Sequence, residues 1–125
     1  DTTGLVFLAD YGQYGNRKIH VIDTTLIQKG SNITMTTSQA IPLDFNPRGI
    51  ALYKNLMYIS AADGSIRCYD REKKKFFLTF KSVPGYTFKG GQKLLVYNNR
   101  LWVTDVSTRE IVGVDIFRNV IEEYE

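Results

Sequence analysis

Two stretches of the chain repeat the same succession of apolar and polar segments about 44 residues apart. Each stretch begins with an apolar run, passes through a two-residue polar turn and enters a second apolar run. Residues 50–60 read IALYKNLMYIS, and residues 93–104 read KLLVYNNRLWVT. An earlier copy starts at its second run, with residues 5–10 (LVFLAD). A repeat of about 40 to 50 residues is typical of propellers and other arrays, so the pattern predicts a repeat architecture.

The apolar runs predict β-strands. They are rich in Val, Ile, Tyr, Phe and Trp, which suit a pleated, packed surface, and about five residues is an ordinary strand length. Three dipeptides at positions 54–55 (KN), 63–64 (DG) and 98–99 (NN) separate the runs. Gly and Asn tolerate positive φ, so these dipeptides are interpreted as hairpin turns.

Each complete unit is predicted to contain four antiparallel strands. In the middle copy the strands cover residues 49–53, 56–61, 65–70 and 75–80. The third strand ends in an aspartate in every copy, at Asp23, Asp70 and Asp115. The first copy lacks its first strand. For the third copy, residues 116–125 are expected to form the fourth strand, with a short helix as the alternative.

The second strand of each copy is apolar on both of its faces. We expect residues 6–9, 57–60 and 101–104 to be equivalent, buried, central strands, because a strand with one face in water would alternate. Tyr58 and Trp102 should then occupy matching positions. Propeller blades cover both faces of a strand by stacking on each other.

Several short motifs carry a family resemblance. Residues 47–51 (PRGIA), 56–60 (LMYIS) and 64–70 (GSIRCYD) resemble one repeat of the NHL and YVTN-type β-propellers, and residues 18–23 (KIHVID) and 101–105 (LWVTD) resemble related forms of its third and second strands. The third copy lacks the Pro-x-Gly motif of that repeat. The resemblance implies an all-β fold of antiparallel four-stranded β-propeller blades. The repeats divide the chain at about 1–46, 47–89 and 90–125.

The length of the chain raises a problem of closure. At 125 residues it holds fewer than three complete blades, whereas propellers close with about four to eight. An unclosed segment would expose apolar faces and strand edges, which act as interaction or aggregation surfaces. Three explanations remain open: the chain is an excerpt of a longer propeller, it completes a ring with other chains, or its repeats form a β-trefoil.

The composition and charge of the chain argue against a membrane-spanning helix and a nucleic-acid partner. No apolar run reaches the roughly 18 residues of a transmembrane helix, and the sequon at Asn32 favours secretion slightly. Lys and Arg number 16 against 13 acidic residues, and the cluster at 73–75 is interpreted as a solvated hairpin tip. We therefore expect no nucleic-acid partner, because phosphate binding needs a basic stripe across one face.

The sequence gives little support for a catalytic or metal-binding site. His20 is the only histidine and Cys68 the only cysteine, which excludes multi-histidine and cysteine-rich metal sites within this chain. Both are expected to pack inside strands. Asp10, Asp63 and Asp105 recur near the end of the second strand. Some lactonase-like propellers bind calcium through acidic residues near their axis, but Asp beside Gly or Ser favours a turn role. No cofactor is expected.

The loop at residues 11–17 (YGQYGNR) is longer than its equivalents in the other copies. Tyr and Arg give large contact areas with polar handles, and long loops on rigid scaffolds often carry function. The residues expected to form a binding rim are Tyr11, Gln13, Tyr14, Asn16, Arg17 and Arg48.

The sequence thus predicts a non-catalytic binding or assembly module, in which rim loops and blade faces contact protein partners. These partners would be the remaining blades of the same propeller or other subunits. One alternative is part of a propeller-type hydrolase or lactonase whose metal ligands lie elsewhere. The other is a trefoil-like binder of carbohydrate or protein.

Overall fold

The computed structural model describes residues 4–10, 17–24, 40–83, 86–89, 91–105 and 107–115. The described residues form antiparallel strands and turns and no α-helix, which confirms the all-β fold and is consistent with partial propeller blades. The prediction for residues 116–125 lies outside this description. The chain divides into two compact units, Asp1–Asn46 and Pro47–Glu125. The division into three repeats stays a prediction.

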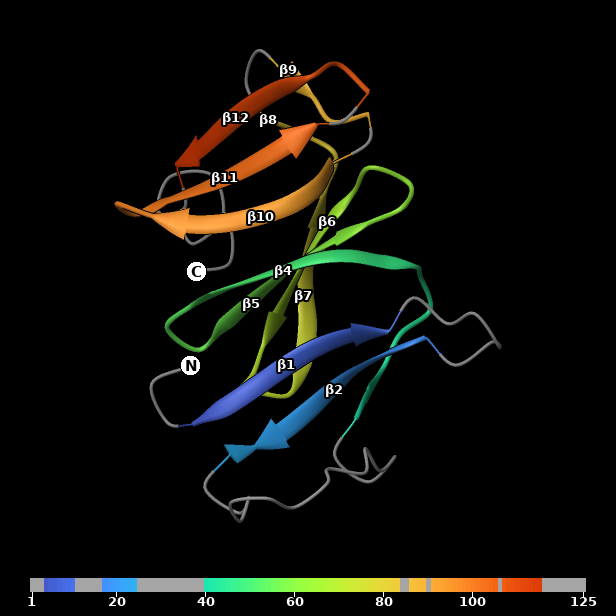
Figure 1. Cartoon of the computed structure of the whole chain (residues 1–125), viewed down its shortest axis with the longest axis vertical. Coiled ribbons are helices and arrows are strands. Elements are labelled where there is room, and N and C mark those ends of the chain that lie inside the picture. Colours follow the sequence, from blue (N-terminus) through green and yellow to red (C-terminus); the bar gives the residue numbers. More distant parts are fainter. Residues whose placement is uncertain are drawn as a thin grey trace. The chain divides into compact units, whose positions relative to one another are not determined.

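Unit 1 contains a sheet with the strand order β1-β2-β3, of which Figure 1 labels β1 and β2. Its strands are β1 (Leu5–Asp10), β2 (Lys18–Asp23) and the short β3 (Ile41–Pro42). The predicted second and third strands of the first copy therefore exist. The prediction that residues 6–9 form a buried, central strand is wrong. β1 lies at one end of this strand order, and Val6 and Leu8 are 40% and 41% exposed.

The first sheet of unit 2 has the order β4-β5-β6-β7. Its strands are β4 (Pro47–Tyr53), β5 (Leu56–Ala61), β6 (Ile66–Asp70) and β7 (Lys75–Phe80), all within two residues of the predicted ranges. β5 is buried along its whole length, as predicted. Gly64 has φ +90°, and Lys54, rather than Asn55, takes the positive φ of the preceding turn.

The second large sheet of unit 2 has the order β10-β11-β12, with β10 (Gly91–Tyr97), β11 (Arg100–Asp105) and β12 (Glu110–Asp115). Asn98 and Asn99 both have positive φ, as expected for a tight hairpin between twisted strands. A small hairpin of β8 (Ser82–Val83) and β9 (Tyr86–Thr87) joins the two sheets. The repeat pattern did not predict this hairpin.

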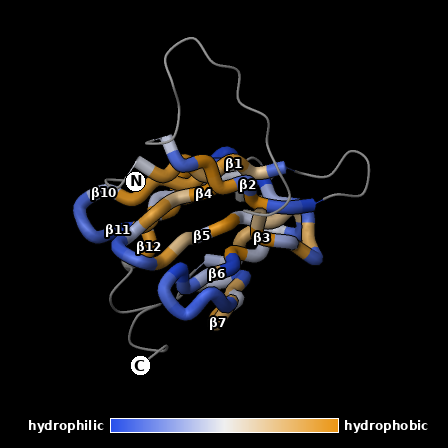
Figure 2. Tube along the Cα trace, turned by 90° about the horizontal axis from the view of Figure 1, so that it is seen from below, coloured by the Kyte–Doolittle hydropathy of each residue, from blue (hydrophilic) through white to orange (hydrophobic). Residues whose placement is uncertain are grey.

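The core of unit 2 lies between its two large sheets, where β10 packs against β4 and β5. Hydrophobic residues follow the strands, and hydrophilic residues gather at the turns (Figure 2). Successive side chains of a strand point to opposite faces, so each sheet contributes alternate residues. The buried residues of this core are Ala51, Leu56, Tyr58, Ile66, Cys68, Phe88, Leu101, Val103 and Val114.

Candidate interaction surface

Tyr58 and Trp102 occupy matching positions in the two large sheets, which confirms the prediction from the repeat. Each is the third residue of the second strand of its sheet. The cross-strand neighbours are Ala51 and Cys68 for Tyr58, and Leu95 and Gly113 for Trp102. The two aromatic rings therefore lie on equivalent faces of equivalent sheets.

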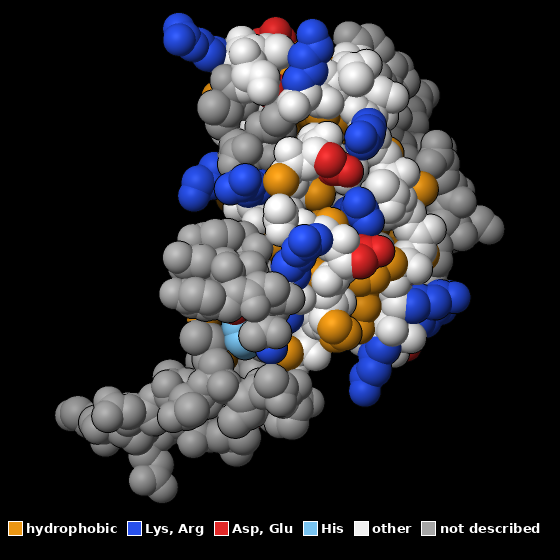
Figure 3. Space-filling model, turned by 90° about the vertical axis from the view of Figure 1, so that its right-hand side faces the viewer, with side chains coloured by type: hydrophobic (Ala, Val, Ile, Leu, Met, Phe, Trp, Pro, Cys, Tyr) orange, Lys and Arg blue, Asp and Glu red, His pale blue; other side chains and the backbone are white. Residues whose placement is uncertain are grey.

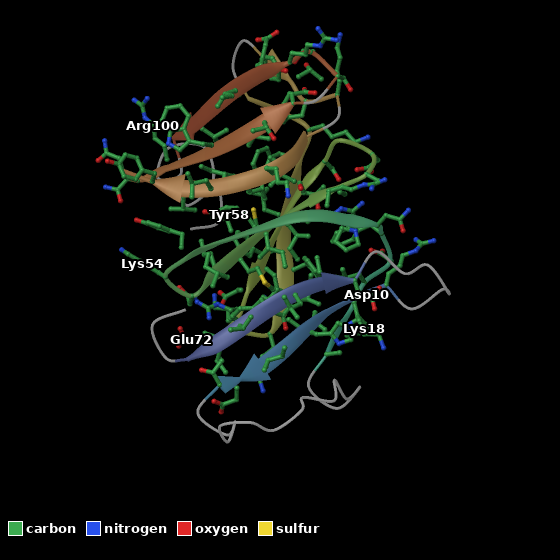
Figure 4. All side chains as sticks on the ribbon, viewed as in Figure 1. Asp10, Lys18, Lys54, Tyr58, Glu72 and Arg100 are labelled. Carbon is green, nitrogen blue, oxygen red and sulfur yellow. The ribbon has the colours of Figure 1, made fainter. Side chains whose placement is uncertain are left out.

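The face that carries Tyr58 is covered. Tyr58 is fully buried in the core of unit 2, together with Leu101, Val103 and Val114 from the second sheet, and Figure 4 shows it between β4 and β10. Burial raises the pKa of its phenol well above the ordinary value. Its hydroxyl has no hydrogen-bond partner among the described residues. The second sheet therefore supplies an aliphatic cover for an aromatic face.

The face that carries Trp102 is open. Leu95, Tyr97 and Ile111 are 61%, 69% and 72% exposed, the highest values of any large hydrophobic residue in the described part of the chain. The prediction that residues 101–104 are buried is therefore wrong for Trp102 and Thr104, which are only half-buried. Burial of both faces would need a further cover over this sheet. We call this surface the Trp102 face and define it by Lys93, Leu95, Tyr97, Trp102, Thr104 and Ile111.

The Trp102 face is hollowed rather than flat. These six side chains, together with Leu94, line a depression of about 350 Å³. The Trp102 indole is held from two sides: its Nε1 donates a hydrogen bond to the Tyr97 carbonyl oxygen at 3.2 Å, and its six-membered ring lies over Gly113. A methyl group on Gly113 would lie 2.9 Å from Cζ3 of the indole. Glycine therefore allows the ring to lie close against the sheet.

Polar groups stand around the apolar part of the Trp102 face. The backbone N–H of Lys93 donates to Oγ1 of Thr104 at 3.1 Å, and Arg100 is exposed near the turn between β10 and β11 (Figure 4). An aromatic anchor inside a polar border is the usual anatomy of a protein-binding surface. The depression is lined mainly by apolar and aromatic side chains, with Lys93 and Thr104 as polar members.

Most of the predicted rim lies outside the described residues: Tyr11, Gln13, Tyr14 and Asn16, together with the sequon residue Asn32. Arg17 is exposed in unit 1, where its Nη1 donates to the Asp44 carbonyl oxygen at 3.4 Å. Arg48 is exposed in unit 2, at a register shift between Pro47 and Gly49. The two arginines thus belong to different units, and the rim stays a prediction.

Two of the recurring aspartates cap turns, as their neighbours in the sequence predict. Oδ1 of Asp63 accepts hydrogen bonds from the backbone N–H and the hydroxyl of Ser65, which lower the pKa of Asp63. Oδ1 of Asp105 accepts from the backbone N–H of Ser107 at 3.1 Å. Asp10 instead lies 3.2 Å from Nε2 of His20.

The described residues contain no group of three or more His, Cys, Asp or Glu that could hold a metal ion. Cys68 is fully buried in β6, and burial raises the pKa of its thiol, so it packs as a small apolar residue, as predicted. Lys and Arg side chains stand among acidic and apolar ones on the surface shown in Figure 3. Within the described ranges, no helix is long and apolar enough to cross a membrane.

The sequence predicted that apolar blade faces contact partners, but it did not identify the residues of the Trp102 face as one of them. A signal was present in alternate positions of the third copy: Leu95, Tyr97, Trp102 and Ile111 all point to one side of the sheet. The sequence predicts that both faces of each second strand are covered in a closed ring and that apolar faces are exposed in an unclosed segment. The structure shows the second situation for the Trp102 face.

No protein family and no curated protein matches the chain. Its fold is similar to parts of solved structures. It matches apo AztD from Citrobacter koseri with 17% identity and a TM-score of 0.58, covering 98% of this chain and 31% of that one. It matches Saccharomyces cerevisiae Sqt1 with 18% identity and a TM-score of 0.54, covering 83% and 25%. It matches the computationally designed Ika4 protein with 13% identity and a TM-score of 0.55, covering 89% and 61%.

The chain thus spans less than two thirds of the length of each of these structures. The similar structures include propeller-type proteins such as Sqt1. At these identities the likeness concerns the fold alone, and it agrees with the stacked antiparallel sheets of unit 2. It does not distinguish an NHL or YVTN repeat from other propeller repeats.

Proposed function

We propose that the chain is a non-catalytic binding and assembly module whose Trp102 face docks onto an apolar protein surface. The observation that carries this proposal is the exposure of Leu95, Tyr97 and Ile111 on one side of a single sheet. Contiguous apolar surface with a polar border marks interaction sites on soluble proteins. Trp102, half-buried in the centre, is the residue type most enriched among binding hot spots.

The motifs of the middle copy support a repeat of the NHL or YVTN type, with repeats at about 1–46, 47–89 and 90–125. The predicted rim would form a second contact region. Its residues are Tyr11, Gln13, Tyr14, Asn16, Arg17 and Arg48. The hydrolase alternative gains no support from Asp63 and Asp105, because both carboxylates are engaged in their own turns.

The proposal is tested with an uncharged, apolar fluorescent dye, N-phenyl-1-naphthylamine, and with Trp102, the only tryptophan of the chain. Dye bound on the Trp102 face accepts excitation energy from the indole, so energy transfer reports binding at this surface. We expect the wild-type chain to bind the dye with efficient transfer. Ile111→Lys should weaken that binding by at least about tenfold, because it places a charge in the apolar depression.

Thr87→Lys is the matched control, because Thr87 is an exposed strand residue of β9 that does not line the depression. It adds the same charge and should leave dye binding unchanged. Far-UV circular dichroism checks that both variants keep their strands. Equal dye binding by the wild type and a folded Ile111→Lys variant would contradict the proposal.

A further inference from the structure

We infer that the Trp102 face docks against the β1–β2 sheet of a second copy of this chain, in a head-to-tail arrangement. This inference rests on the proposed function and adds the identity of the partner. The docking surface on the second copy is called the Val6 face and is defined by Val6, Leu8, His20 and Ile22. These four residues lie on one side of unit 1, because Val6 pairs with Ile22 and Leu8 pairs with His20.

The interface inside unit 2 shows which side of a sheet covers an aromatic face. The Tyr58 side of the first sheet is covered by Leu101 and Val103, the second and fourth residues of β11. Both side chains are fully buried there. An aliphatic pair at these two strand positions is therefore the natural cover for the aromatic side of a preceding sheet.

The Val6 face presents the same pair at the same positions. Val6 and Leu8 are the second and fourth residues of β1. The register is also the same, because the first residue of the strand lies opposite the closing aspartate in each sheet. These pairs are Leu5 with Asp23, Leu56 with Asp70, and Arg100 with Asp115. Val6 and Leu8 thus correspond to Leu101 and Val103.

The two corresponding pairs differ in exposure. Leu101 and Val103 are fully buried, whereas Val6 and Leu8 are 40% and 41% exposed. The chain therefore displays both halves of an interface that it already forms once inside unit 2. The aromatic half is the Trp102 face and the aliphatic half is the Val6 face. A second copy brings the matching half to each open face.

The shape of the Trp102 face agrees with this pairing. The depression of about 350 Å³ beside Trp102 can receive aliphatic side chains such as those of Val6 and Leu8. Because the two faces differ, the contact is heterologous and leads to a closed ring or a filament.

The test is a mixing experiment followed by sedimentation velocity, from micromolar to near-millimolar protein. We expect the wild-type chain to self-associate. Leu8→Lys inactivates the Val6 face and Ile111→Lys inactivates the Trp102 face. Each folded variant alone should lose at least about tenfold in association constant. Thr87→Lys, with the same added charge, should associate like the wild type.

An equimolar mixture of Leu8→Lys and Ile111→Lys should form a dimer, because one intact face of each kind remains. A wild-type chain that stays monomeric over this range would overturn the inference. Dissociation by Ile111→Lys but not by Leu8→Lys would also overturn it, since the occupant would then be another surface. The proposed function would survive that second outcome and fail only with its own dye test.

Discussion

The contact between Gly113 and Trp102 makes a quantitative prediction about the Trp102 face. A Cβ atom on Gly113 would lie 2.9, 3.1 and 3.2 Å from Cζ3, Cη2 and Cε3 of the indole. Because side-chain carbons do not approach each other so closely, Gly113→Ala must push the ring away from the sheet. The ring can swing outward, since its outer side is partly exposed. It would then lose the hydrogen bond from Nε1 to the Tyr97 carbonyl oxygen.

The expected free-energy changes predict that Gly113→Ala destabilises the fold. The lost hydrogen bond contributes about 1 kcal/mol to the free energy of unfolding, and the lost apolar contact of the ring contributes roughly another 1 kcal/mol. Replacing a strand glycine by alanine offsets about 0.5–1 kcal/mol of this by restricting the unfolded chain. We therefore expect Gly113→Ala to lower the free energy of unfolding by about 1 kcal/mol. Trp102 emission should shift to longer wavelength as the ring becomes more exposed.

A double-mutant cycle separates the clash from the backbone effect. In a Trp102→Leu background no indole opposes the new methyl group, so Gly113→Ala should stabilise the chain by about 0.5–1 kcal/mol. The coupling energy between the two positions should then be about 2 kcal/mol, within the range for residues in contact. Urea unfolding followed by circular dichroism gives all four free energies. The same effect of Gly113→Ala in both backgrounds would refute the reasoning.

Three further predictions concern buried groups and the open face. Tyr58→Phe should raise the free energy of unfolding by up to about 1 kcal/mol in urea, because it removes a buried hydroxyl without a described partner; a loss of stability would contradict this. Trp102→Ala should lower the free energy of unfolding by about 2 kcal/mol, less than the roughly 3–5 kcal/mol expected for truncating a fully buried tryptophan. Burial raises the pKa of Asp105, but hydrogen bonds from Lys89, Tyr86 and Ser107 outweigh burial and lower it. Its carboxylate therefore stabilises the fold above the unfolded pKa of about 3.9 and ceases to do so as pH falls through the lower folded value. Between pH 7 and pH 3, the free energy of unfolding should therefore fall less for Asp105→Asn than for the wild type, and urea unfolding at both pH values measures this difference.

The strand positions of the two large sheets of unit 2 could be predicted from the sequence because they depend on local rules. Alternating side chains and the turn residues at 54–55 and 98–99 set the strands within two residues of the observed bounds. The turn roles of Asp63 and Asp105 followed from their immediate neighbours in the same way. Hairpin geometry involves residues close in sequence, so composition and spacing were sufficient.

Local rules do not say which face of each sheet is exposed, although the shortage of blades predicted that an unclosed segment would expose apolar faces. Tyr58 and Trp102 share a strand position and similar neighbours in sequence, yet only Tyr58 is fully buried. What decides the difference is whether a second sheet lies on top, which is a non-local contact. Val6 and Leu8 are exposed in β1 although their equivalents Leu101 and Val103 are buried. The repeat pattern reports what each position can bury, and only the assembled structure reports what covers it.

The strand position that Tyr58 and Trp102 share is nevertheless aromatic in all three sheets, and its cross-strand neighbour varies with it. Its residue and its cross-strand neighbour are Phe7 with Val21, Tyr58 with Cys68, and Trp102 with Gly113. As the ring grows, the neighbour shrinks, so the pair fills a similar volume in each sheet. Close-packed interiors penalise both voids and overpacking, which makes such compensation expected wherever a sheet meets a cover of constant shape. A face that always met water would impose no such constraint. The Trp102 and Gly113 pair therefore supports the interpretation that this face, like the Tyr58 face, is built to pack against another sheet.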